Sequence, residues 1–398
     1  MNILIVSKYP PIEGGVSSQN YWMAKALGQR GHKIFVVSNC WEVEQRFREQ
    51  IEEKELHLLE PKNVELFSTS PEFRSPIPFS RYYESRITSI ALDVINKHNI
   101  DVVYSHYLLP YGISALIVKR ITNKPWLLQH AGSDITRLFS FSQLKSIFVE
   151  CFKNAGRVIG YSNTREKFLE NNLDVNKLIH VNRSIDLKEF SPNVELYDFS
   201  GFDIDEETTI FTYFGKISGL KKTYELVDAA SEIRNEDFRL VFVTENGKSV
   251  EELKHFAEKK GIIKKCIFMP FMPPWKIPSI MKASSCIVCP ESEEEPYLPK
   301  GTHGPQIARE AMAVGKAVII GKGVKEKGIY KNTTEGENIL IVDPANKQNF
   351  SETLKFVINN KEKVKEIGRN ARKFAEQNEN FENYISSMEN VFNSLLEK

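Results

Sequence analysis

The sequence lacks any uninterrupted apolar run of about 18 residues, the length that a membrane-spanning helix requires. It also lacks an excess of charge of either sign, because 53 lysines and arginines face 52 aspartates and glutamates. Binding to a phosphate backbone needs a clustered positive excess, so this balance argues against nucleic acid as the main partner. The opening residues MNILIVSKYPP have neither a basic segment nor a small-residue cleavage site, and we expect a first strand there rather than a signal peptide.

Cysteine is scarce as well, and the five that occur are an odd number that does not suit a disulfide framework. Cys286 and Cys289 form a CxxC pattern, which elsewhere indicates redox or metal chemistry. Here the pattern lies in the strand-like run SSCIVCP, where residues three apart point to opposite faces. We therefore interpret both as buried structural cysteines and expect a reducing, cytoplasmic environment.

The chain alternates strand-like and helix-like segments throughout, which is typical of parallel α/β sheets. After the first strand, a helix is expected over Ser17–Arg30, which Gly31 ends. The first series of strands is expected at Asn2–Ser7, Lys33–Ser38, Asp101–His106, Trp126–Ala131 and Arg157–Ser162. A second series begins near Thr209 with TIFTYFG, RLVFVTE, CIFMPF, SCIVCP, AVIIG and NILIVD.

A length of 398 residues suits two domains, each with its own core. Ser191–Glu207 contains proline and acidic residues with weak periodicity, so we place the domain boundary there. The predicted fold is α/β, with two Rossmann-like domains over residues 1–195 and 208–375 and a C-terminal helix over 376–398. Two such domains are expected to face each other across a cleft, a common location for small-molecule sites.

The stretch from Cys286 to Ile320 predicts a ligand crevice in the second domain. A strand, an acidic loop rich in glycine and proline, and a helix carrying Glu310 follow one another there. Ligands of α/β domains lie outside the carboxyl ends of the strands, and the start of a helix favours anions. A carboxylate on the first turns of such a helix can accept two ribose hydroxyls, which is the role we predict for Glu310.

Two glycine-bearing loops follow predicted strands. Gly14 and Gly15 lie between the first strand and the first helix, where glycine permits close approach to a phosphate or a sugar; a simple tight turn explains them equally well. Gly215 follows the first strand of the second series, and Lys216, Lys221 and Lys222 precede a helix that starts near Thr223. The alternatives there are a solvated basic loop and a diphosphate clamp, and the position at a strand end favours the clamp.

Histidines follow two strands of the first domain. His130 lies at a strand end in QHAGSDI, where a neutral imidazole can donate to a sugar hydroxyl or stabilise developing charge. We favour a functional role for His130 and a structural one for His106. The glutamates of the loop after Cys289 have only the distant His303 as a further ligand type, so no metal site is predicted.

These segments together resemble the retaining GT-B glycosyltransferases of family four, over nearly the whole chain. The first Gly-Gly loop matches, and HAGSD is similar to the HGxD-like segment of the family. Asn182-Arg183-Ser184-Ile185-Asp186, with Phe190 and Pro192, resembles the NGVDxxxFxP segment. Gly215-Lys216 through Lys221 resembles the GRLxxxKG loop, and EAMAVGKAVI resembles the segment around the second glutamate of the family's EX7E motif.

The resemblance implies a nucleotide-diphosphate sugar donor, a hydroxyl acceptor on a glycan or a lipid-linked glycan, and transfer without a metal or other cofactor. Lys216 and Lys221 would hold the diphosphate and Glu310 the ribose. Gly14 and Gly15 would approach the phosphates, and His130 would lie near the transferred sugar. The catalytic set expected from it is therefore His130, Lys221 and Glu310.

The sequence departs from the family pattern at several positions. Thr302 stands where the first glutamate belongs, so either that glutamate is absent or an insertion displaces it and Glu294 or Glu295 serves. In the second case His303 and Gly304 lie near the donor sugar. Lys216 replaces an arginine, which changes a guanidinium fork into a point charge. Lys222 replaces a glycine.

The acceptor side offers two segments with alternatives. Phe67–Arg86 is rich in aromatic residues and arginine, and Arg81 and Arg86 are its predicted acceptor ligands; Arg137–Lys153 is amphipathic. Both would suit peripheral docking on a membrane that carries a lipid-linked acceptor, while an ordinary long loop and an ordinary core-facing helix are the alternatives. Two other functions stay open: a degenerate homologue that binds nucleotide or a protein partner without turnover, and a sugar-nucleotide epimerase.

Overall fold

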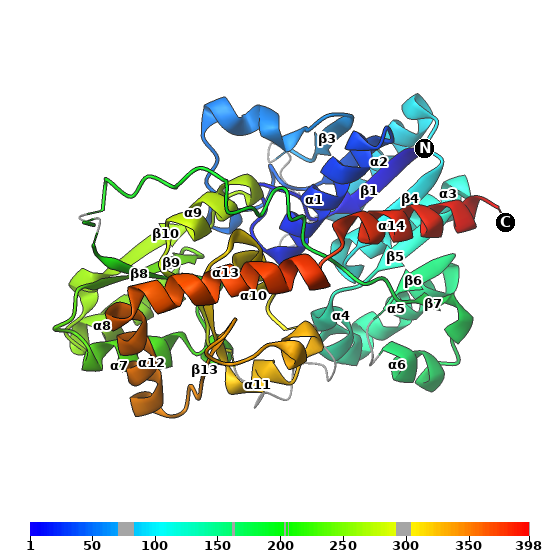
Figure 1. The fold of residues 1–398 in the computed structure, drawn as a ribbon. Coiled ribbons are helices and arrows are strands. Elements are labelled where there is room, and N and C mark those ends of the chain that lie inside the picture. The colour runs from blue at the N-terminus through cyan, green and yellow to red at the C-terminus, as the bar shows by residue number, and fades with distance from the viewer. Residues whose placement is uncertain (71–82, 161–163, 203, 206, 292–303, 398) are drawn as a thin grey trace. The chain divides into compact units, whose positions relative to one another are not determined.

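The computed structural model describes residues 1–70, 83–160, 164–202, 204–205, 207–291 and 304–397. The chain forms two compact units. Unit 1 contains Met1–Arg183 and returns at Glu382–Lys398, and unit 2 contains Ser184–Pro296 and Gly301–Phe381. In its described part each unit holds one parallel sheet with helices packed against it (Figure 1).

The sheet of unit 1 has the strand order β3-β2-β1-β4-β5-β6-β7, and every described pair is parallel. The order places β1 and β4 side by side, so the chain leaves these two neighbours in opposite directions. The strands are β1 (Asn2–Ser7), β2 (Lys33–Ser38), β3 (Val64–Ser68), β4 (Val102–His106), β5 (Trp126–Gln129), β6 (Arg157–Ile159) and β7 (Leu178–Ile179).

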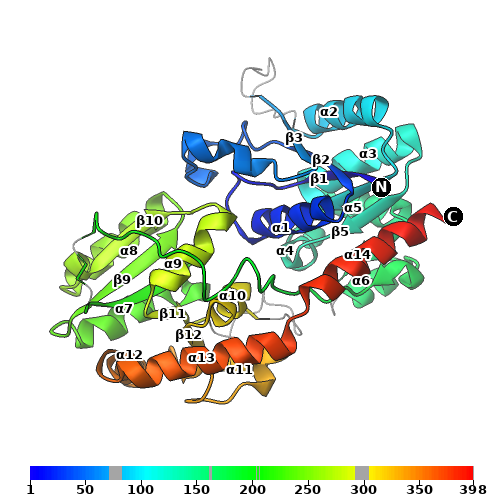
Figure 2. The ribbon, with the colours of Figure 1, turned by 45° about the horizontal axis from the view of Figure 1, so that its top comes forward.

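Helices cover the sheet of unit 1 because residues on both faces of its strands are apolar. The helices are α1 (Gly15–Gln29), α2 (Tyr83–His98), α3 (Ile113–Thr122), α4 (Gly132–Thr136), α5 (Ser142–Asn154), α6 (Thr164–Glu170) and α14 (Phe381–Leu396). Figure 2 shows α2 and α3 on one side of β1 and β2, with α1 on the other. The ring of Phe392 from α14 lies at a centroid distance of 6.3 Å from that of Tyr104 on β4.

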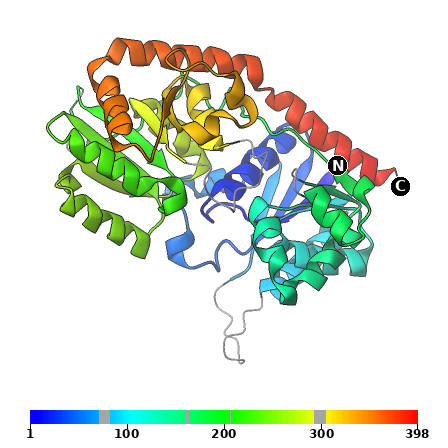
Figure 3. The same cartoon turned by 90° about the horizontal axis from the view of Figure 1, so that it is seen from below.

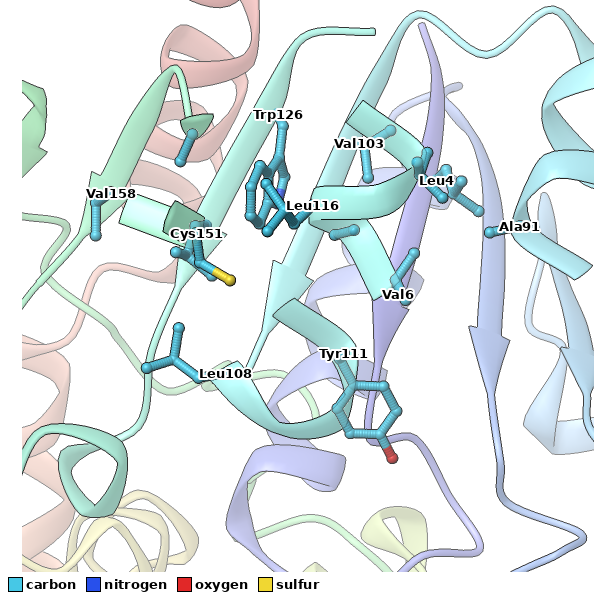
Figure 4. Close-up of a cluster of buried hydrophobic side chains, with 14 of the residues drawn as sticks. Leu4, Val6, Ala91, Val103, Leu108, Tyr111, Leu116, Trp126, Cys151 and Val158 are labelled. Carbon is cyan, nitrogen blue, oxygen red and sulfur yellow. The ribbon is translucent and has the colours of Figure 1, made fainter. Parts of the chain in front are cut away.

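Trp126, the first residue of β5, lies at the centre of the core of unit 1. Its side chain is fully buried on the side of the sheet that α3 and α5 cover (Figure 4). Its indole Nε1 donates to Ser105 Oγ at 2.9 Å, which satisfies its one polar group. Helix α5 buries Phe148, Cys151 and Phe152 in this core, as the core-facing interpretation of that segment expects.

Unit 2 has the strand order β10-β9-β8-β11-β12-β13, again with parallel pairs only among the described strands. The strands are β8 (Thr209–Phe214), β9 (Phe238–Thr244), β10 (Cys266–Pro270), β11 (Cys286–Cys289), β12 (Ala317–Gly321) and β13 (Leu340–Val342). The helices are α7 (Thr223–Glu232), α8 (Lys248–Lys259), α9 (Ile277–Ala283), α10 (Gln306–Val314), α11 (Lys322–Lys325), α12 (Lys347–Asn359) and α13 (Lys361–Asn378).

One hydrophobic cluster joins the sheet of unit 2 to four of its helices. Helices α7, α8, α12 and α13 contribute to it, and Figure 3 shows α12 and α13 in orange, following one another. Cys286 lies in this cluster, and both it and Cys289 are buried with free thiols, as predicted. The C-terminal part of the chain forms two helices, α13 and α14, because the chain turns at Glu379 and Asn380 between them.

Candidate functional site

The carboxyl ends of β8 and β11 form the topological switch point of unit 2. These strands are neighbours, but the chain continues from β8 to β9 on one side and from β11 towards β12 on the other. The loops that follow them therefore diverge and leave a crevice between them, where ligands of open α/β sheets bind. Lys216 and Lys221 follow β8, and Glu310 lies on α10 after β11, so the predicted donor residues of unit 2 lie on the elements that flank this point.

The turn after β8 depends on Gly215. This residue has φ 146°, and a Cβ atom there would lie 2.9 Å from the hydroxyl of Tyr213. That hydroxyl donates to the carbonyl of Lys216 at 2.8 Å and fixes the path of the chain. The ammonium of Lys216 then lies 3.5 Å from Glu245, which follows β9.

Lys221 forms an ion pair with Glu291, two residues beyond the end of β11. The pair bridges the two diverging loops, and the side chain of Lys221 stays 39% exposed. Gly321, at the end of β12, lets the loop after β11 approach closely, since a Cβ there would lie 2.1 Å from the carbonyl oxygen of Glu291. Sequence analysis did not predict Glu291 as the partner of Lys221, because the two residues are far apart in the chain.

Lys222 adopts a left-handed conformation with φ 54°, directly before α7. A lysine is uncommon in this region of backbone space, which glycine enters without cost. The family pattern has glycine at this position, so the backbone keeps the conformation although the residue differs. The ammonium of Lys222 lies 3.4 Å from Glu225 on the first turn of α7.

Glu310 lies in the second turn of α10 and is 4% exposed. Gln306, one turn earlier, donates from Nε2 to Oε1 of Glu310 at 2.7 Å. Burial raises the pKa of the Glu310 carboxyl to about 7. The four-residue spacing of Gln306 and Glu310 is visible in the sequence and is the signal that would have revealed this contact.

The end of β11 brings these groups together. Burial raises the pKa of the Cys289 thiol well above its usual range, and the charges of Glu291, Lys221 and Glu310 act on the same thiol. The charged groups of the β8 loop, the β11 loop and α10 are therefore near a single strand end. A buried carboxyl group and a half-exposed ammonium there can bind hydroxyls and an anionic group of one ligand.

Arg309 anchors α10 from the opposite side. Its guanidinium makes a bidentate ion pair with Glu379, with Nε 2.7 Å from Oε1 and Nη2 2.6 Å from Oε2. Both side chains are buried. Oε2 of Glu379 also accepts from Ser184 Oγ at 2.8 Å and from the backbone N–H of Ile185 at 3.0 Å. Sequence analysis missed this network because 70 residues separate its two charges.

The segment before α10 contains the remaining predicted donor residues. Gly304 lies against the ring of Tyr330, whose hydroxyl donates to the carbonyl of Pro305 at 2.6 Å. Tyr330 thus fixes the segment that directly precedes α10. Glu294, Glu295, Thr302 and His303 lie outside the described residues, so the two alternatives for the first glutamate stay predictions.

In unit 1, Gly14 and Gly15 follow β1 as predicted, but α1 begins at Gly15, two residues before the predicted start at Ser17. Gly14 has φ 113° and directly precedes α1, and Gly15 is its first residue. Lys8 donates from Nζ to the carbonyl of Glu13 at 2.7 Å, which shapes the same turn.

His130 is fully buried at the end of β5, and both of its ring nitrogens have partners. Nδ1 lies 2.9 Å from the carbonyl oxygen of Ala131, and Nε2 lies 2.8 Å from Thr164 Oγ1. Because a carbonyl only accepts, this network assigns the proton to Nδ1 and leaves Nε2 to accept from the hydroxyl. Burial lowers the pKa of His130 to about 4, so the ring is neutral at pH 7.

Asp134 holds the turn that contains His130. It accepts from the backbone N–H of Ala131 at 2.8 Å and from that of Leu108 at 3.1 Å. His106 ends β4, is fully buried, and has a pKa lowered well below its usual range, chiefly by burial. Its Nδ1 lies 3.4 Å from Asn20 Oδ1, which suits the structural role expected of it.

Of the two predicted acceptor ligands, Arg86 is described and Arg81 lies outside the described residues. Arg86 makes an ion pair with Glu42 at 2.5 Å and donates to the carbonyl of Ser70. Its guanidinium therefore holds two segments of unit 1 together, and contact with an acceptor would compete with this pair.

Neither a metal-binding group nor a membrane span occurs in the described part of the chain. No three or more His, Cys, Asp or Glu side chains there are arranged to hold a metal ion. None of the described helices is both long and apolar enough to cross a bilayer.

Two family models match the chain, one over each half. Residues 198–374 match the model for "Glycosyl transferases group 1" and residues 13–189 the model for "Glycosyltransferase Family 4". A glycosyltransferase of Methanocaldococcus jannaschii is 24% identical over 290 residues, which cover 72% of this chain and 74% of that protein. The D-inositol 3-phosphate glycosyltransferase of Rhodococcus jostii is 26% identical over 56% of this chain, a match that spans 47% of the relative.

Solved structures share the fold over the whole chain. Sucrose-phosphate synthase from Thermosynechococcus elongatus superposes with a TM-score of 0.71 at 15% identity, and the match covers 99% of both chains. The Anabaena protein HepE, solved in complex with UDP and glucose, has a TM-score of 0.69 at 18% identity over 99% of this chain and 100% of its own. At these identities the likeness concerns the fold alone, and it confirms the predicted α/β class.

Proposed function

Since the chain belongs to the group 1 glycosyltransferases and has their GT-B fold, we propose that it transfers a hexose from a nucleotide-diphosphate sugar to a hydroxyl acceptor. We propose further that the transfer retains the anomeric configuration. The observation that carries the proposal is the convergence of Lys221 and Glu310 at the end of β11.

The proposed donor site uses the switch point of unit 2. Glu310 is suited to accept the two ribose hydroxyls, since its carboxyl group is fixed by Gln306 on the first turns of α10. Lys216 and Lys221 are suited to the diphosphate as point charges on the β8 loop. The Anabaena protein HepE, which has the same fold, was solved with UDP and glucose, and this supports a nucleotide-sugar donor.

The chemistry asked of these residues is charge stabilisation. When the bond between the anomeric carbon and the diphosphate breaks, negative charge grows on the leaving diphosphate, and ammonium groups held in place beforehand lower the energy of that state. Retention is explained if the acceptor hydroxyl attacks from the face that the diphosphate leaves and gives its proton to a diphosphate oxygen. Lysines supply the positive charge in this scheme, and no metal is proposed.

Residues of unit 1 complete the proposal through the family resemblance. Gly14 and Gly15 are assigned to the phosphates and His130 to the transferred sugar. His130 is neutral, and its Nε2 accepts a hydrogen bond from Thr164 in this structure. We therefore propose that His130 acts on the sugar indirectly, through the turn that His130 and Asp134 stabilise. The acceptor, a sugar or a lipid-linked glycan reached at a membrane surface, and the cytoplasmic location stay predictions.

A turnover assay separates this proposal from its alternatives. Wild-type protein is incubated with the glucose, galactose, mannose and N-acetylglucosamine conjugates of UDP, GDP and ADP, and nucleoside diphosphate release is measured. We expect release with one nucleotide class and a loss of about 100-fold in Lys221→Ala, the order seen when a group that stabilises transition-state charge is removed. Lys259→Ala, an exposed lysine at the end of α8, is the matched control.

The other outcomes identify the competing functions. An isomeric sugar nucleotide formed without diphosphate release would indicate an epimerase. Nucleotide binding without turnover of any conjugate would indicate the degenerate homologue.

A further inference from the structure

A second cavity of unit 2 lies at the other end of its sheet. Its volume is about 500 Å³. It is lined by Thr209 at the start of β8, by Ser285 directly before β11, and by Lys316 and Ala317 at the start of β12. These are the amino ends of the strands, whereas Lys221, Glu291 and Glu310 gather at the carboxyl ends. The cavity is therefore separate from the proposed donor site.

Positive charge dominates the wall of this cavity. Among the described residues, five cationic side chains line it and one carboxylate accompanies them. The cations are Lys282, Lys316, Lys361, Lys365 and Arg369. The carboxylate belongs to Glu207, which pairs with Lys361 at 2.5 Å and is itself 88% exposed. This exposed pair is weak, and Lys282, Lys316 and Arg369 make no ion pair with the described residues, so most of the positive charge is uncompensated.

Lys316 lies in the short connection between α10 and β12. It follows Gly315, which ends α10, and its side chain is partly buried. Within the described residues its ammonium makes no hydrogen bond and no ion pair. Burial, together with the charges of Lys282 and Lys365, lowers its pKa to about 8. Like charges near a buried ammonium cost free energy that a bound anion would offset.

Helix α13 supplies the facing wall. Lys361, Lys365 and Arg369 recur at intervals of four residues, so they lie along one face of the helix. Lys365 also pairs with Glu362 of its own helix at 2.8 Å. Helices α10 and α13 pack against each other, and Arg372 of α13 donates to the carbonyl of Ala313 near the end of α10. The packing of α10 against α13 thus holds Lys316 beside the cationic face of α13, where the pairs of Lys361 and Lys365 with glutamates are exposed.

We propose that this cavity binds a small molecule through a phosphate group, held between Lys316 and the cationic face of α13. A volume of about 500 Å³ is in the range of small-molecule sites and exceeds the need of a free phosphate ion, so a phosphate monoester of sugar size is the chemistry that fits. The ligand acts as an effector rather than as a donor, because the site lies at the opposite end of the sheet from Glu310. Helix α10 links the two ends: Glu310 lies about 6 Å along its axis from Val314, its last residue, and Lys316 follows two residues later.

The test is calorimetric titration with glucose 6-phosphate, with inorganic phosphate, and with glucose as the uncharged control, at constant ionic strength. We expect saturable binding of glucose 6-phosphate, weaker binding of inorganic phosphate and none of glucose. Lys316→Met with Lys365→Ala should weaken binding at least tenfold. Lys363→Ala, an exposed lysine two residues from Lys361 and from Lys365 and so on another face of α13, should leave it unchanged.

Further variants make the outcome decisive. Lys365→Glu replaces an exposed side chain, so it tests the site even where the double variant does not fold. Lys221→Ala distinguishes this site from the donor site: binding of glucose 6-phosphate should persist in it while donor turnover falls. Absence of saturable binding to wild type, equal binding to Lys365→Glu, or loss of binding in Lys221→Ala would each overturn the proposal.

Discussion

At the scale of single residues, Glu310 imposes a pH dependence on nucleotide binding. Its carboxyl pKa is raised by burial to about 7 from an ordinary value of 4.5. Only the ionised carboxylate can accept two hydroxyl hydrogen bonds, so affinity should fall as pH drops from 8 to 6, by up to about tenfold per pH unit below the pKa. Calorimetric titration at pH 6, 7 and 8 measures this slope. An equal slope in Glu310→Gln would assign it to another group.

Glu310 also makes stability depend on pH, in the opposite direction: low pH favours the folded state, whereas high pH favours nucleotide binding. Because the folded pKa lies above the unfolded one, the folded protein binds the proton more tightly. The contribution of Glu310 to the free energy of unfolding therefore declines as pH rises from about 4.5 to about 7. Glu310→Gln keeps an oxygen that accepts from Gln306 and removes the buried charge. We expect denaturant unfolding at pH 8 to show no loss of stability in this variant, so any loss of nucleotide binding is local.

The residues of the site were predictable where their chemistry depends on position next to a strand end. Glu310, Lys216 and Lys221 follow predicted strands, and the structure places the two lysines in the loop after β8 and Glu310 on α10, the helix after β11. Glu291 was not predictable as the partner of Lys221, because sequence distance does not reveal which loops meet. The burial of His130 and its contact with Thr164 depend on packing between β5 and α6, which a single sequence does not show.

At the scale of elements, Glu379 stabilises the contact between α10, the end of α13 and the chain segment at Ser184. Glu379→Ala leaves the buried guanidinium of Arg309 without its carboxylate, which should cost about 3–5 kcal/mol of unfolding free energy. Denaturant unfolding measures this change. Glu376→Ala is the control on the same helix: its pair with Arg372 is half-exposed on the glutamate side, and we expect a loss below about 1 kcal/mol. Equal losses in both variants would contradict the proposed network.

Most elements could be read from the sequence because parallel, doubly covered strands are continuous apolar runs. Asn2–Ser7, Lys33–Ser38 and Ala317–Gly321 have the predicted bounds. Strands β3 and β7 were missed. Strand β3 lies at the edge of the sheet and has a single buried residue, and β7 has only two residues, so neither has an apolar run. The end of α13 at Asn378 was missed because the amphipathic pattern resumes at once in α14.

At the scale of the whole molecule, the chain leaves unit 1 after Arg183 and returns to it at Glu382. The two passages are held together, since the backbone N–H of Asn380 donates to Ser184 Oγ at 2.7 Å. Helix α14 then becomes part of unit 1: Arg30 pairs with Glu382 at 2.5 Å and with Glu389 at 2.6 Å. The last helix is thus part of the core of the first unit, although it follows the second in sequence.

Phe392 tests the contribution of α14 to unit 1. Its side chain is fully buried beside Tyr104, so Phe392→Ala should lower the free energy of unfolding by about 3–5 kcal/mol. Asn393→Ala, an exposed neighbour on the same helix, should change it by less than about 0.5 kcal/mol. Thermal unfolding monitored by tryptophan fluorescence reports chiefly on unit 1, which holds three of the four tryptophans, while Trp275 lies in unit 2. An unchanged transition in Phe392→Ala would show that α14 is dispensable for the unit.

The central claim is that the switch point of unit 2 binds a nucleotide diphosphate through Glu310 and Lys221. Calorimetric titration with UDP, GDP and ADP against wild type, Glu310→Gln, Lys221→Ala and Lys259→Ala tests it most directly. The account predicts selective binding of one nucleotide, weakened at least tenfold in the first two variants and unchanged in the third. Binding that ignores both substitutions, or no binding of any nucleotide by the folded wild type, would contradict it.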